Sequence, residues 1–289
     1  MSNAASSPEQ REQVGIRQAF EMLAVEWGDA VFHRLVAVGD FAFFVWRTFT
    51  WLVTRRPQRG TLLPPMHQVG VLSLPVVALT GTFIGMVLAV QSFFQFSKIG
   101  LESRLGAVIN MSLVRELGPV LAATMLAGRV GGAIAAELGT MRVTEQLDAL
   151  EAMGADPIHY LVVPRFLACL LLIPSLTIMA DFMGVIGGYV YCVVVLGIDK
   201  HFYLYNSAQF VGGFDLFVGV FKSLFFGAAI ALISCYRGFH SDAGAEGVGR
   251  AATASFVLSF VTILILDLML GIFLDTIYSW LWPAGARLF

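Results

Sequence analysis

Charged residues lie inside several long apolar stretches of this sequence, where a helix that crosses a bilayer normally excludes them. Arg115 and Glu116 are adjacent at one end of an apolar run, while Asp181, Lys222 and Asp267 each stand within another. An ion pair at membrane depth usually faces a polar cavity, which makes Arg115 and Glu116 candidates for a binding site. The alternative is that both side chains extend to lipid headgroups. Asp181, Lys222 and Asp267 could relay protons, but ion pairs that fasten helices are the interpretation we favour.

The other chemistry-bearing residues form no enzyme motif. A phosphate-binding loop needs Gly-Lys-[Ser/Thr], and none of the three lysines, Lys98, Lys200 and Lys222, follows a glycine. The five histidines match neither HExxH nor another zinc spacing, and no serine stands in a G-x-S-x-G motif. We therefore expect no catalytic residue, metal site or cofactor in this chain.

The composition is that of an integral membrane protein. Of the 289 residues, 57% are hydrophobic and 13% are charged, and the mean hydropathy is +0.78. The net charge of −2 argues against binding to nucleic acid. The first fourteen residues are polar, so we expect no cleavable signal peptide.

The apolar pattern predicts an all-α membrane protein in three parts. We expect a disordered extension over 1–15, an amphipathic interfacial helix region over 16–59, and a five-span membrane domain over 60–289. Within the second part, 41–53 contains Arg47 and suits a membrane surface better than a crossing, although an extra span is the alternative. The five predicted crossings are 70–97, 111–136, 166–198, 216–236 and 251–282.

Basic residues predict the orientation of these crossings. Arg55, Arg56 and Arg59 form a cluster before the first crossing, and arginines also flank the loops that follow the second and fourth. Cytoplasmic loops carry an excess of arginine and lysine, so the N-terminus is predicted in the cytoplasm. Five crossings then leave the C-terminus on the opposite side.

A short polar helix is predicted between the second and third crossings. Thr144 can cap a helix of about nine residues that begins at Glu145 and ends at Gly154 and Asp156-Pro157. Its apolar and acidic residues fall along different sides of the helix, which suits docking to a soluble partner; a solvated loop is the alternative. The candidate coupling residues are Glu145, Leu147, Asp148, Leu150, Glu151 and Met153.

The segment 115–157, RELGPVLAATMLAGRVGGAIAAELGTMRVTEQLDALEAMGADP, resembles the signature region of the MlaE-type permeases. These are the membrane subunits of Mce-associated lipid ABC transporters. FIGMVLAVQ at 83–91 and GRAAT at 249–253 are also similar to the family.

The resemblance implies partners and a substrate. Two copies would pair, each binding a cytoplasmic ABC ATPase that holds ATP and magnesium, beneath a periplasmic ring of Mce-domain protein; a small cytoplasmic accessory subunit is an open alternative. The complex would lie in the bacterial inner membrane and move phospholipid to maintain outer-membrane asymmetry. By matching positions, the lipid-binding residues would be Leu88, Gln91, Gln95, Phe96, Ile99, Arg115 and Glu116.

Three functions from different classes compete. An ATP-driven permease explains both the short polar helix and the missing nucleotide site. An ion-coupled secondary transporter would work through the embedded Asp and Lys residues, but predicts paired repeats that five crossings do not supply. A scaffold protein would not need charges in its crossings. The permease is the function that the sequence favours.

Overall fold

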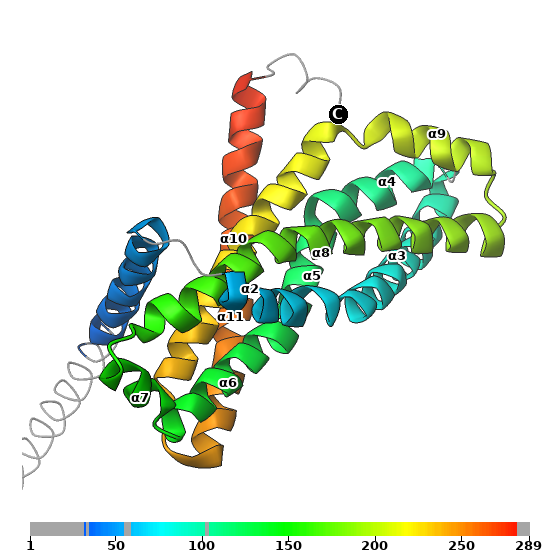
Figure 1. Cartoon of the computed structure of the whole chain (residues 1–289). Coiled ribbons are helices and arrows are strands. Elements are labelled where there is room, and N and C mark those ends of the chain that lie inside the picture. Colours follow the sequence, from blue (N-terminus) through cyan, green and yellow to red (C-terminus); the bar gives the residue numbers. More distant parts are fainter. Residues whose placement is uncertain (1–31, 33–34, 55–58, 102–103, 282–289) are drawn as a thin grey trace, which may run out of the picture. The chain divides into compact units, whose positions relative to one another are not determined.

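The structure is a computed structural model that describes residues 32, 35–54, 59–101 and 104–281 (Figure 1). Every regular element within these ranges is helical, which confirms the predicted all-α membrane fold. The predicted disordered segment 1–15, most of 16–34, and Arg55 and Arg56 lie outside the described residues. The chain divides into two compact units, 1–50 and 51–289.

The described residues contain six helices that are long and apolar enough to cross a membrane. Five of them overlap the five predicted crossings, and the additional one is Leu35–Thr54. That helix has 20 residues rather than the thirteen of the predicted segment 41–53, so its length also suits a crossing. Its position at the membrane surface stays a prediction. The six are Leu35–Thr54, Gly60–Ile99, Leu105–Val143, Ile158–Val195, Gly213–Phe239 and Gly244–Trp280.

The long helices are built from shorter regular segments. The α-helical parts are α2 (Arg59–Met66), α3 (Leu74–Phe96), α4 (Leu105–Ser112), α5 (Gly118–Leu126), α6 (Gly132–Val143), α7 (Gln146–Ala152), α8 (Val163–Tyr189), α9 (Lys200–Phe210), α10 (Gly213–Phe239) and α11 (Gly244–Leu281). Turns of π-helix separate several of them: η1 (His67–Val71), η4 (Leu113–Leu117), η5 (Ala127–Gly131), η6 (Ile158–Val162) and η7 (Val190–Val195).

Proline accounts for the position of three of these π-helical turns. Pro75, Pro119 and Pro164 stand in the first positions of α3, α5 and α8, after η1, η4 and η6. Proline has no backbone N–H and its ring crowds the preceding turn, so the helix widens there instead of continuing its regular ladder. The turn η4 carries Arg115 and Glu116, two of the predicted lipid-binding residues.

Helix α8 lies at the centre of the unit formed by residues 51–289, between α3 and α10, and α10 packs in turn against α6 and α11. Backbones approach closely where α3 meets α8. A Cβ added to Gly85 would lie 1.9 Å from the carbonyl oxygen of Gly184, and one added to Gly81 would lie 2.5 Å from that of Ala180. Small residues are what permits such contact between membrane helices.

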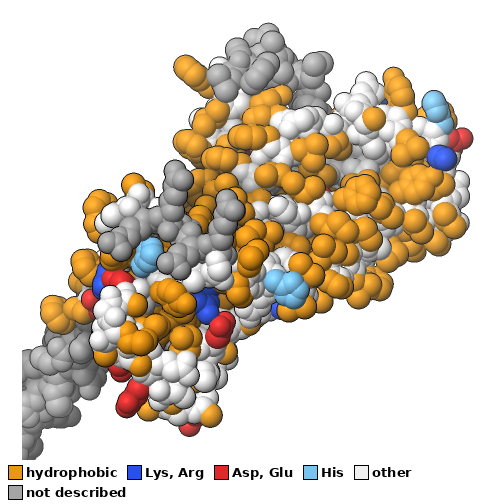
Figure 2. Space-filling model, in the orientation of Figure 1, with side chains coloured by type: hydrophobic (Ala, Val, Ile, Leu, Met, Phe, Trp, Pro, Cys, Tyr) orange, Lys and Arg blue, Asp and Glu red, His pale blue; other side chains and the backbone are white. Residues whose placement is uncertain are grey.

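The ends of this unit differ from its middle. Helix α7 lies at one end and α9 at the other (Figure 1). In the view of Figure 2, hydrophobic side chains cover most of the face between them, as expected for a lipid-exposed surface. Helix α9 falls between the predicted crossings 166–198 and 216–236, where no helix was predicted. Asp199 caps it by accepting hydrogen bonds from the backbone N–H groups of His201 and Phe202.

The α3–α8 contact predicts which glycine tolerates a side chain. Gly85→Ala should lower the thermal unfolding temperature of the purified protein by several degrees, because overpacking costs about 1–3 kcal/mol. Gly132→Ala is the matched control, since nothing lies within 4 Å of its added Cβ. Equal unfolding temperatures for the two variants would contradict the close packing of α3 on α8.

Candidate functional site

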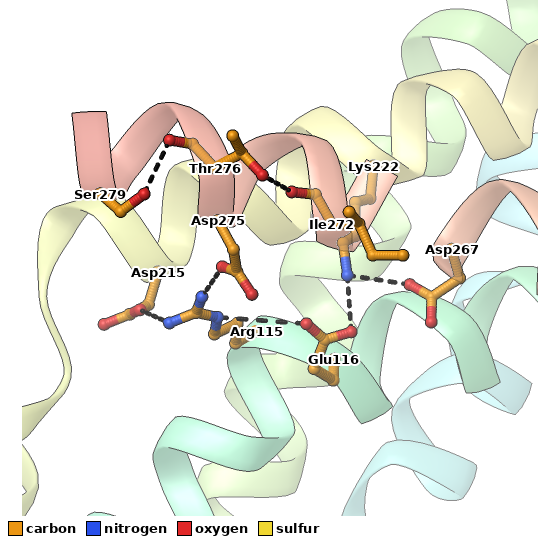
Figure 3. Close-up of polar contacts among 9 residues, drawn as sticks. All are labelled: Arg115, Glu116, Asp215, Lys222, Asp267, Ile272, Asp275, Thr276 and Ser279. Atoms are coloured by element: carbon orange, nitrogen blue, oxygen red, sulfur yellow. Dashed lines mark hydrogen bonds and ion pairs between the residues drawn. The ribbon is translucent and has the colours of Figure 1, made fainter. Parts of the chain in front are cut away.

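The embedded charges of three long helices meet in one cluster (Figure 3). Lys222 of α10 is completely buried. Its Nζ donates to Glu116 Oε2 of η4 at 2.5 Å and to Asp267 Oδ1 of α11 at 2.9 Å. The lysine therefore holds one carboxylate from each neighbouring helix, and its own burial is compensated by two opposite charges.

Arg115 forms the second half of the cluster. Its guanidinium donates a hydrogen bond to Asp275 of α11 and lies 3.6 Å from Asp215 Oδ1 of α10. Arg115 Nε is also 4.0 Å from Glu116 Oε1, so the two halves are continuous. Asp215 accepts a hydrogen bond from the backbone N–H of Gly212 at 2.9 Å, which holds it at the first turn of α10.

Two carboxylates of the cluster, those of Glu116 and Asp275, are more exposed than its cations. The cluster joins two cations, Arg115 and Lys222, to four carboxylates. The side chain of Lys222 is 0% exposed and that of Arg115 is 22% exposed, against 42% for Glu116 and 57% for Asp275. The resemblance to the permease family made Arg115 a predicted lipid-binding residue. In the structure its guanidinium is occupied by carboxylates, so a phosphate would have to replace one of them.

Asp181 does not belong to this cluster. It is 5% exposed, and its Oδ1 has no hydrogen-bond partner among the described residues. The carboxyl packs against Gly118, where an added Cβ would lie 1.7 Å from Asp181 Oδ1. Lys222 and Asp267 therefore form an ion pair between helices, as favoured from the sequence. Asp181 takes no part in it and packs at Gly118, the residue after η4.

The predicted lipid-binding residues fall into two groups. Arg115 and Glu116 are in the charge cluster. On α3, Leu88 and Phe96 pack against the apolar cluster of Ala89, Leu105, Ile109, Cys192 and Tyr203, whereas Gln91, Gln95 and Ile99 are exposed. The contacts described for 59–101 and 104–281 do not join Arg115 and Glu116 to the other five predicted residues. A single pocket formed by all seven therefore stays a prediction.

An apolar hollow of 580 Å³ lies elsewhere, where α2, η1 and the start of α3 meet α8. His67 and Ser175 are polar exceptions in a lining that otherwise consists of aliphatic side chains and Gly70. None of the seven predicted lipid-binding residues lines this hollow. Sequence reasoning gave no signal for it, because no polar or charged pattern marks the residues that form it.

The predicted coupling helix exists as α7, but its start differs from the prediction. Thr144 does not cap it, since its hydroxyl donates to the carbonyl oxygen of Thr140 at 2.9 Å. The N-cap position is Glu145, which has a left-handed backbone with φ of 58°. The predicted stop at Gly154 is confirmed by its φ of 79°.

The six predicted coupling residues differ in exposure. Leu147 is buried within the chain and Leu150 is half-buried, so Leu147 anchors α7 instead of presenting a free side chain. Met153 is 73% exposed. Glu145, Asp148 and Glu151 are exposed as well, and Asp148 forms a 2.8 Å ion pair with Arg142.

A helical fold of this kind, with ion pairs between its long helices, defines a multi-pass membrane protein with a polar site inside its apolar body. The chain belongs to the MlaE permease family, whose model, described as permease MlaE, matches residues 62–273. It is therefore a permease of the ABC transporter class, as the names of its relatives also indicate.

Three relatives illustrate the range of similarity. A probable ABC transporter permease of Rickettsia conorii is 44% identical over 79% of this chain and 88% of its own length. A probable ABC transporter permease of Synechocystis is 43% identical over 83% of this chain and 90% of its length. The intermembrane phospholipid transport system permease protein MlaE of Haemophilus influenzae is 34% identical over 84% of this chain and 94% of its length.

The pairing of Lys222 predicts a stability change that its partners should reverse. Lys222→Met leaves Glu116 and Asp267 without their cation and should destabilise the protein by about 3–5 kcal/mol. Adding Glu116→Gln and Asp267→Asn should restore most of that loss. Unfolding of the purified variants in detergent measures both effects, with Lys200→Met at the exposed start of α9 as the control. A triple variant no more stable than Lys222→Met would contradict the pairing.

Proposed function

We propose that this chain is the membrane-spanning subunit of an ATP-driven transporter that moves phospholipid between the inner and outer membranes of a bacterium and so maintains outer-membrane lipid asymmetry. The observation that carries the proposal is the charge cluster of Arg115, Glu116 and Lys222 at helix junctions of an MlaE-family permease. A relative of this chain is named as a permease of intermembrane phospholipid transport. A transporter of amphiphiles needs polar groups beside apolar surface, and this unit contains both.

In this proposal the cluster receives the polar headgroup. Its outer rim consists of Glu116 and Asp275, so the headgroup first meets carboxylates and then the guanidinium of Arg115 beneath them. The acyl chains would lie along the outer half of α3, past Leu88, Gln91, Gln95, Phe96 and Ile99. Two copies of the chain would face each other and close the pocket between them.

The energy would come from a separate ABC ATPase that binds ATP and magnesium. Helix α7 would transmit its movement, because α7 stands between the two long helices Leu105–Val143 and Ile158–Val195. Met153 would contact the ATPase, and Leu147 would hold α7 on its own chain. Closure of the ATPase would change the population of open and closed pockets through this contact.

The proposed orientation follows from the arginines near α7. With the N-terminus and α7 in the cytoplasm, the C-terminus and α9 would face the periplasm of the inner membrane. A ring of Mce-domain protein would cover the pocket on that side and give lipid a route across the periplasm.

Affinity purification tests the proposal as a whole. The tagged chain, extracted in mild detergent, should bring down an ABC ATPase, an Mce-domain protein and stoichiometric phospholipid, all identified by mass spectrometry. If the chain purifies alone and moves a solute down an ion gradient in vesicles, an ion-coupled secondary transporter replaces the proposed function.

The exposure of Met153 predicts a selective loss of ATPase binding. Met153→Asp places a charge in the proposed contact and should weaken recovery of the ATPase by about tenfold, which corresponds to about 1.4 kcal/mol. Insertion and thermal stability should be unchanged, because the side chain is exposed. Phe202→Asp, on α9 at the other end of the unit, is the control. Full recovery of the ATPase with Met153→Asp would exclude Met153 from the contact.

A further inference from the structure

The segment that follows α7 is fastened to a distant part of the chain. After the left-handed turn at Gly154, Asp156 uses both of its carboxylate oxygens. Oδ1 accepts a hydrogen bond from the backbone N–H of Ile158 at 2.9 Å, at the start of the long helix that contains α8. Oδ2 accepts a hydrogen bond from Trp51 Nε1 at 3.1 Å, although the two residues are 105 positions apart.

Trp51 makes a second contact in the same place. Its ring lies beside that of His159, with centroids 5.1 Å apart and planes at 50°. Trp51 and Asp156 are both half-buried, so their hydrogen bond is partly shielded from water and geometrically defined. Trp51 belongs to the last turn of helix Leu35–Thr54, and this turn is therefore fixed to the exit of α7 by one hydrogen bond and one ring contact.

The entry of α7 is held differently. The Arg142–Asp148 ion pair there joins side chains that are 46% and 58% exposed, and exposed pairs of this kind add little rigidity. Glu145 and Gly154, on either side of α7, both have positive φ. Residues that absorb such backbone changes at the ends of an element are typical hinge positions. Asp156 is two residues beyond Gly154, so any movement of α7 that is passed on to the α8 helix passes through Asp156.

We infer that the Trp51–Asp156 contact is a coupling clamp: it carries displacement of α7 to the last turn of helix Leu35–Thr54 and to the start of the α8 helix at the same time. The inference rests on the proposed role of α7 in docking an ATPase. Trp51 and Asp156 are positioning residues in this account. They touch neither nucleotide nor lipid, and they determine how much of each ATPase movement reaches the permease.

The test compares Trp51→Phe with wild type in the complete complex, reconstituted with its ATPase in phospholipid vesicles. Phenylalanine keeps a ring beside His159 but removes the N–H donor. Trp46→Phe is the matched control, because Trp46 lies on the same helix and is 73% exposed. ATP hydrolysis and transfer of fluorescent phospholipid are measured in the same vesicles. Hydrogen exchange of the 44–54 and 146–158 peptides is compared with and without a non-hydrolysable ATP analogue.

Trp51→Phe should lower lipid transferred per ATP hydrolysed at least fivefold, while Trp46→Phe stays within twofold of wild type. The analogue should change exchange in both peptides of the wild type and only in 146–158 of Trp51→Phe. A proportional fall in hydrolysis and transfer, or an unchanged exchange response, would overturn the clamp alone. A wild-type chain that recruits no ATPase would instead overturn the proposed function, and the clamp with it.

Discussion

The organisation of the charged site depends on one buried amine. Lys222 has no exposed surface, so its charge is tolerated only because Glu116 and Asp267 stand within hydrogen-bond distance. Those two acids come from different helices, and the same amine therefore sets the spacing of η4, α10 and α11. Arg115, next to Glu116 in the chain, is likewise paired with two carboxylates, those of Asp215 and Asp275. Because Pro119 widens the helix into a π-helical turn just before α5, two consecutive side chains can both join the cluster.

Much of this arrangement could be predicted from residue types. Long apolar runs locate the membrane helices because a bilayer tolerates few alternatives, and charges inside those runs marked Arg115, Glu116, Lys222 and Asp267 as special. The sequence did not reveal which charges pair. Pairing depends on how α10 is rotated about its axis, which the close backbone packing at Gly219 and Gly227 constrains. Nothing in the sequence indicated that Asp275 would be a principal partner of Arg115.

The short helix α7 was likewise only partly predictable from the sequence. Its existence and its stop at Gly154 followed from local chemistry, but its start did not. Thr144 is a good N-cap by type, and its hydroxyl instead bonds to the preceding turn of α6, which leaves Glu145 in a left-handed conformation. The apolar stripe was also ambiguous, since a helix that docks on a partner and a helix anchored to its own chain both need one. Leu147 anchors α7 to its own chain, whereas Met153 is exposed.

We propose that the charge cluster forms the polar end of the lipid site. An electron cryomicroscopy structure of the complex purified with its native lipid would test this placement. Headgroup density should lie within hydrogen-bond distance of Arg115, Glu116 or Asp275, with Lys222 still between Glu116 and Asp267. Lipid density confined to the apolar hollow between α2 and α8, with the cluster closed and without ligand, would contradict it.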